Sequence, residues 1–133
     1  MIVLDENILE GQRLRLESWR IAARQIGVDI GRKGMKDEEI VVLLRGRRGV
    51  TFFTRDAGFY LRGLRHKSYC LAVMSVGQNE VAAFARRFLR HPDFDTQAAR
   101  MGKVVRVSPT GLASWRLRSQ LEVHANWIAP TRR

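Results

Sequence analysis

Acidic side chains gather at three places in a chain that is otherwise strongly basic. They are Asp5 and Glu6 after an apolar run, the triplet Asp37, Glu38 and Glu39, and Asp56 after a second apolar run. Carboxylates brought close together repel one another unless a proton or a cation lies between them. Mg2+ or Mn2+ suits such a set of oxygen ligands, and a metal site of this kind can activate water against a phosphodiester.

The charge balance points to the partner. Lys and Arg number 24 against 13 Asp and Glu, which gives a net charge of +11. Most of the positive charge is arginine, whose planar group suits phosphate oxygens. We therefore expect a polyanionic partner, nucleic acid first and an anionic membrane surface second.

Membrane insertion and export are not expected. No apolar run approaches the ~20 residues of a membrane span. The N-terminus lacks the basic region of a signal peptide. Cys70 is the only cysteine, and a reducing, cytoplasmic setting fits a chain with no internal disulfide.

The elements that must position the acids follow from the apolar pattern. The run at 2–4 is typical of a strand buried on both faces near the centre of a parallel sheet, and ligands bind beyond the carboxyl ends of such strands. Further strands are predicted over 28–30, 50–54, 70–74 and 103–107, and helices over 8–26, 37–45, 57–64 and 78–90. This alternation predicts a three-layer α/β domain over residues 1–128, with a basic tail over 129–133.

Several element ends depend on single residues. Asn7 is a good N-cap and Gly27 a natural C-terminal stop for the helix over 8–26. Asp37 is expected to cap the next helix, with Glu38 and Glu39 in its first turn, and this capping role needs no metal. The alternation over 113–118 favours a hairpin after the last strand, and a helix over 112–123 stays open.

Other kinds of site find little support. The chain contains no P-loop, no glycine-rich dinucleotide motif, no zinc-ligand spacing and no nucleophile motif. Its histidines and tryptophans are expected to be structural or at the surface, and Cys70 to be a small buried apolar residue. A phospho-accepting receiver domain shares the acids at strand ends. Against it, Met-Pro does not follow Asp56, and Lys103 comes before its strand.

The order of the acidic motifs resembles the compact PIN-like domains, small relatives of the VapC-type toxins of type II toxin–antitoxin pairs. Three stretches carry the likeness: the opening Ile2-Val3-Leu4-Asp5-Glu6-Asn7, then Gly34 followed by Asp37-Glu38-Glu39-Ile40, then Thr54-Arg55-Asp56 before Phe59. The likeness covers about residues 1–76 in order and spacing.

This resemblance implies a PIN fold and a Mg2+- or Mn2+-dependent endoribonuclease. It implies RNA as substrate and a cognate antitoxin as protein partner, while a homodimer is left open. The catalytic acids would be Asp5, Asp37 and Asp56, and the residues holding metal would be Asp5, Glu6, Asp37, Glu38 and Asp56. Asn7 would have a supporting role.

One departure from the family pattern concerns the third motif. The compact members usually continue it as Thr-x-Asp-x-Asp-Phe, whereas Gly58 stands here in place of the second acid. Three acidic positions then remain, which argues against two metals unless Glu6 or Glu39 compensates. The alternative is a weak or inactive PIN-like domain that binds nucleic acid or a partner protein. In either case the residues expected to hold phosphate are Arg45, Arg47, Arg48, Arg62, Arg65 and Lys67.

Overall fold

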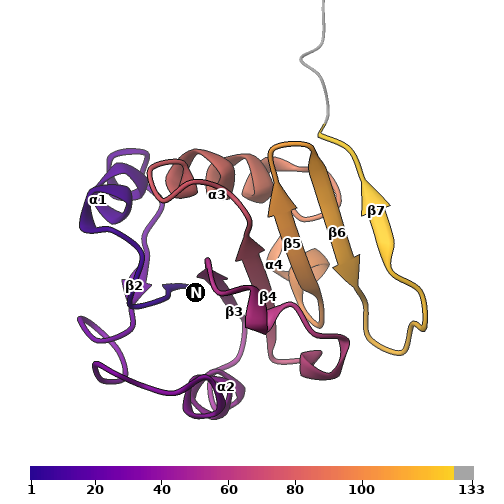
Figure 1. The fold of residues 1–133 in the computed structure, drawn as a ribbon, viewed down its shortest axis with the longest axis horizontal. Coiled ribbons are helices and arrows are strands. Elements are labelled where there is room, and N and C mark those ends of the chain that lie inside the picture. Colours follow the sequence, from indigo (N-terminus) through magenta and orange to yellow (C-terminus); the bar gives the residue numbers. More distant parts are fainter. Residues whose placement is uncertain (128–133) are drawn as a thin grey trace, which may run out of the picture.

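One seven-stranded sheet runs through the middle of the protein in the order β2-β1-β3-β4-β5-β6-β7 (Figure 1). The computed structural model describes residues 1–127, so the predicted tail lies outside it. The strands are β1 (Ile2–Leu4), β2 (Arg24–Gln25), β3 (Val50–Thr54), β4 (Tyr69–Met74), β5 (Val104–Ser108), β6 (Gly111–Trp115) and β7 (Val123–Ala125). Neighbours from β2 to β5 pair in parallel, and β6 and β7 are antiparallel additions. The predicted α/β class with a mostly parallel sheet is confirmed.

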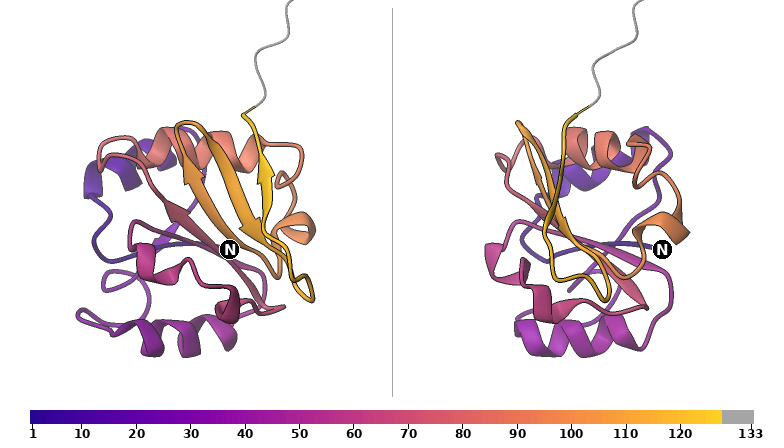
Figure 2. Two further views of the ribbon diagram at one scale, coloured as in Figure 1. Left: turned by 45° about the vertical axis from the view of Figure 1, so that its right-hand side comes forward. Right: turned by 90° about the vertical axis from the view of Figure 1, so that its right-hand side faces the viewer.

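Helices cover both faces of the sheet (Figure 2). α1 (Glu10–Ser18) and α3 (Val81–Arg90) lie over one face, and α2 (Asp37–Arg45) lies over the other with the short turns η1 (Ala57–Phe59) and η2 (Arg62–Leu64). Each face has its own aromatic core. Phe53 meets Phe88 edge-on at 5.9 Å under α3, and Phe52 meets Phe59 edge-on at 5.5 Å on the α2 side. None of the described helices is long and apolar enough to cross a membrane.

Four of the predicted elements agree closely with the structure. α2 and β3 have the predicted bounds, β4 begins one residue earlier, and β5 is displaced by one. The hairpin is confirmed, because β6 pairs with β5 through the turn before Gly111. That pairing rules out a helix over 112–123.

The helix predicted over 8–26 is much shorter, because the chain turns out of it at Arg20. Arg20 has a φ of 62°. The N–H of Ile21 donates to Leu16 O at 3.0 Å, and the N–H of Arg20 donates to Glu17 O at 2.9 Å. These two bonds form a Schellman ending, which usually has glycine or asparagine at the left-handed residue. With arginine there, the sequence carries no visible stop signal.

Other boundaries were also predicted wrongly. Asn7 does not cap α1, which starts from Leu9 without a side-chain cap, and Gly27 follows β2 instead of ending a helix. The strand predicted over 28–30 is only a bridge between Ile26 and Ile30. The helix over 57–64 is the pair of turns η1 and η2, α3 begins at Val81, and the loop over 91–102 contains α4 (Gln97–Arg100). The strand β7 was not predicted.

Two glycines test how backbone conformation contributes to stability, because an added Cβ would meet nothing within 4 Å at either. Gly11 lies inside α1, so Gly11→Ala should raise the free energy of unfolding by roughly 0.5–1 kcal/mol. Gly34 has a φ of +76°, so Gly34→Ala should lower it by about 1–2 kcal/mol. Urea denaturation measures both changes, and equal effects of the two substitutions would contradict the argument.

Candidate functional site

The predicted acids meet where the strand order reverses. From β1 the chain goes to β2 on one side and then crosses to β3 on the other side, and continues outward to β4 and β5. Ligands of open parallel sheets bind outside the carboxyl ends of the strands at such a switch point. Asp5 follows the end of β1, and Asp56 comes two residues after the end of β3.

A chain of hydrogen bonds joins these two strand ends through Thr54. The buried Thr54 hydroxyl donates to Asp5 Oδ2 at 2.6 Å and accepts from the Asp56 N–H at 3.0 Å. The other oxygen, Asp5 Oδ1, accepts from the Glu6 N–H at 2.7 Å. Burial raises the pKa of Asp5, although the hydrogen bonds from Thr54 and Glu6 lower it in part. Each oxygen of Asp5 therefore accepts one hydrogen bond from the protein, and these bonds orient its carboxylate.

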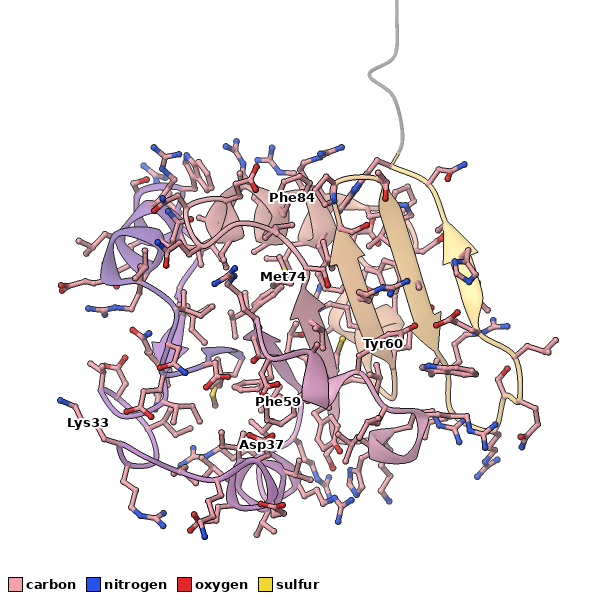
Figure 3. The ribbon with its side chains drawn as sticks, in the orientation of Figure 1. Lys33, Asp37, Phe59, Tyr60, Met74 and Phe84 are labelled. Carbon is pink, nitrogen blue, oxygen red and sulfur yellow. The ribbon has the colours of Figure 1, made fainter. Side chains whose placement is uncertain are left out.

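The third acid comes from the opposite side of the same edge. α2 runs antiparallel to the strands of the parallel sheet, so its first residue, Asp37, lies at their carboxyl ends, between α2 and Phe59 (Figure 3). A Cβ built on Gly58 would lie 3.0 Å from Asp56 Oδ1 and 3.8 Å from Asp37 Oδ2, so the two carboxyl groups face the same small space. Burial, then the negative charges of Asp56 and Asp5, raise the pKa of Asp37. The pair is exposed to solvent, and a proton or a cation between the two carboxylates would relieve their repulsion.

The remaining acids do not join this pair. Glu6 Oε1 accepts from the Gly34 N–H at 2.9 Å. Glu39 Oε1 accepts from the Lys36 N–H at 3.0 Å and its other oxygen pairs with Arg32, so Glu39 has the capping role that its position favours. Lys36, and not Asp37, is the residue that precedes α2.

Glu38 and Asn7 lie on the protein surface near the site. Glu38 lines an exposed groove beside α2 together with Met35 and Val42. The Asn7 side chain has no hydrogen-bond partner among residues 1–127. Glu6 and Glu39 have partners of their own, so neither replaces the acid that is missing at Gly58.

The space left by Gly58 faces the acid pair. A Cβ at Gly58 would lie 3.0 Å from Asp56 Oδ1 and 3.8 Å from Asp37 Oδ2. The Gly58 N–H donates to Asp56 Oδ1 at 2.8 Å, which fixes the Asp56 carboxylate against η1. A side chain at position 58 would thus point toward both carboxylates.

A metal ion at this edge would have two principal protein ligands. Among residues 1–127, no three Asp, Glu, His or Cys side chains are spaced to hold a metal ion together. Mg2+ does not need three, since it usually binds through one or two carboxylates and keeps several waters. Asp37 and Asp56 provide that kind of oxygen pair, and Asp5 supports them through Thr54.

Comparison of the chain with protein-family models, curated proteins and solved structures finds no match. The function must therefore be argued from the geometry of the site and from the surfaces around it.

Most of the basic residues expected to hold phosphate lie at the other end of the sheet. Arg45 ends α2, Arg47 and Arg48 precede β3, and Lys67 precedes β4. The two loops lie together there, with the Gly49 N–H donating to Ser68 O at 3.0 Å. Since β3 has five residues, at ~3.3 Å each, this amino edge lies about 16 Å from the acids. The structure does not bring these side chains to the acid pair.

Arg62 and Arg65 brace the loop between β6 and β7. Arg65 Nη1 donates to Arg116 O at 2.7 Å and to Ser119 O at 2.8 Å. Arg62 Nη1 donates to Gln120 Oε1 at 3.1 Å. The guanidinium of Arg65 is thus already engaged by backbone oxygens, which leaves it few donors for phosphate.

Two further predictions are confirmed. Lys103 precedes β5, so it lies at the amino edge and cannot take the place of the receiver-domain lysine beside the acids. Cys70 is fully buried in β4, and burial raises the pKa of its thiol to about 12, as expected of a core residue.

Two polar residues that the sequence analysis passed over hold the site together. Gln25 is buried in β2, and its Nε2 donates to Ile8 O at 2.7 Å and to Asp5 O at 3.1 Å, which fixes the turn after β1. Gln12 of α1 accepts from the Ala82 N–H at 2.9 Å and so connects α1 with the start of α3. Their sequence neighbours, Gly11 and Arg13 for Gln12 and Arg24 and Ile26 for Gln25, give no signal for either role.

The raised pKa of Asp37 predicts a pH-dependent stability. Between the ordinary and the raised pKa of Asp37, the folded protein binds more protons than the unfolded chain. The stability that this proton contributes is fully present below the ordinary carboxyl pKa and is lost as pH rises through the raised pKa. In EDTA at pH 7, Asp37→Asn should therefore melt at a higher temperature than wild type, and the difference should vanish near pH 3.5. Glu38→Gln, in the same helical turn, is the control for the helix dipole. If both variants shift alike, the acid pair is not the cause.

Proposed function

We propose that this protein is a metal-dependent nuclease that cleaves RNA. The observation that carries the proposal is the exposed pair Asp37 and Asp56, whose carboxyl groups face the same small space at the switch point of a parallel sheet. Two carboxylates in this position favour a hard divalent cation. The net charge of +11 favours a polyanionic substrate.

Each residue has a definite part in the proposal. Asp37 and Asp56 would hold Mg2+ or Mn2+, and Asp5 would hold Thr54, whose hydroxyl orients the backbone of Asp56. The bound ion would supply an activated water and stabilise charge at the scissile phosphate. Gly58 leaves the substrate side of the pair open.

The finer assignment extends the likeness described from the sequence. We propose a PIN-like domain that acts as the toxin of a type II toxin–antitoxin pair, with an antitoxin as protein partner. The strand-end acids and the parallel sheet support this proposal, as does the position of Asp37 at the start of α2.

A second candidate is a binding domain without cleavage. Gly58 in place of an acid, and the absence of a three-ligand set among residues 1–127, are the observations that favour it. It predicts salt-sensitive RNA binding that is unchanged by EDTA.

The first test of the nuclease is Asp56→Asn. Cleavage of single-stranded RNA with Mg2+ or Mn2+ should fall by more than roughly 100-fold. Losing a residue that only hydrogen-bonds to a metal ligand typically costs up to about that much, and Asp56 would be a ligand itself. The rise in melting temperature caused by millimolar Mn2+ should be lost as well. Asp95→Asn, an exposed acid in the loop before α4, is the matched control. Retained metal-dependent cleavage in Asp56→Asn would disprove the assignment, and no cleavage in wild type would favour the binding domain.

A second test restores the missing acid. Gly58→Asp places a third carboxylate beside Asp37 and Asp56, so Mn2+ affinity measured by calorimetry should rise on the order of tenfold. Gly58→Asn has the same shape without the charge and should leave affinity unchanged or lower. Equal affinities of the two variants would show that the cation does not bind at this edge.

A further inference from the structure

Five arginines cover the outer side of α1 and α3. We call them the arginine face; they are Arg15, Arg20, Arg86, Arg87 and Arg90. The two helices lie side by side on one face of the sheet (Figure 1), and nitrogen-tipped side chains gather along their border (Figure 3). This surface is distinct from the amino-edge residues that the sequence analysis selected.

Three of the five guanidinium groups of this face lie over aromatic rings. Arg86 lies 4.5 Å and Arg15 5.9 Å from the centre of the Trp19 ring. Arg87 lies 4.3 Å from the centre of the Trp127 ring and 5.1 Å from that of Phe84. A stacked guanidinium keeps its N–H edge available for oxygen acceptors. Its orientation is fixed before a partner binds, which lowers the entropy cost of binding.

Acidic side chains do not neutralise this face. α3 contains no acid, and Glu10 and Glu17 of α1 both pair with Arg13, outside the face. Within the described part of the chain, none of the five guanidinium groups makes a salt bridge. The positive field of the face is therefore directed to solvent.

We infer that the arginine face binds the phosphate backbone of nucleic acid. The net charge of +11 favours a polyanion with closely spaced charges, such as nucleic acid. An acidic protein is the competing partner and is one outcome of the test. The inference deepens the proposed function by naming the surface that holds RNA. Binding at this face needs neither metal nor cleavage, so it can fail or succeed independently of the nuclease assignment.

The test uses Asp56→Asn protein in EDTA, so that no RNA is cut. Fluorescence anisotropy with a labelled single-stranded RNA of about 20 nucleotides gives the affinity and its salt dependence. Arg87→Gln with Arg90→Gln, both exposed positions, should weaken binding about tenfold and reduce the slope of log K against log salt by about 1.4. The control, Arg116→Gln with Arg118→Gln, removes the same charge from two exposed residues between β6 and β7 and should change affinity less than about twofold.

Three outcomes would overturn the inference. Equal losses from the two double variants would mean that only net charge matters, and unchanged RNA affinity in Arg87→Gln with Arg90→Gln would leave these arginines a structural role. Poly-glutamate that displaces RNA at equal charge concentration would point to an acidic protein instead. Arg87→Lys separates stacking from charge: if the stack matters, this variant also loses affinity while its melting temperature stays close to that of wild type.

Discussion

The register between β1 and β3 is the constraint on which the site depends. Leu4 pairs with Phe53, so the next residues of the two strands, Asp5 and Thr54, also lie opposite one another. The Asp5 N–H continues the ladder to Phe53 O at 2.9 Å, and the Thr54 hydroxyl closes it on the Asp5 carboxylate. A slip of one residue would turn Thr54 to the other face of the sheet. The buried aromatic side chains of β3 prevent that slip, because they would then exchange the cores that they fill.

The same edge concentrates negative charge in a basic protein. Asp5 is buried with both oxygens satisfied, whereas Asp37 and Asp56 remain exposed and close together. The fold thus separates one buried, hydrogen-bonded acid from two exposed acids that repel each other. The dipole of α2 favours a negative charge on Asp37 at the start of the helix. The negative charge of Asp56 opposes it. A bound cation would satisfy both carboxylates at once.

The sequence predicted correctly those elements whose local pattern matches the way they pack in the fold. α2 has acids in its first turn and a clear apolar side, and β3 and β4 are short apolar runs buried on both faces. The prediction of α1 was wrong because the apolar spacing continues past residue 18, while the actual stop is an arginine in the left-handed region. The convergence of the acids was predictable from their strand-end positions. The roles of Gln25 and Thr54 depend on pairing between distant strands, which no local pattern reveals.

The placement of the arginines shows why net charge alone cannot locate a binding surface. Arg65 holds the loop before β7, and Arg100 donates to Thr51 Oγ1 at 2.9 Å and to Phe94 O at 2.9 Å, so both serve the fold. In the sequence they are indistinguishable from Arg87, whose guanidinium lies on aromatic rings and faces solvent. The two kinds of arginine differ in what lies nearest to the guanidinium group, an oxygen atom of the protein or an aromatic ring, and this depends on tertiary contacts. A dense basic cluster in the sequence therefore does not show which of its guanidinium groups serve the fold.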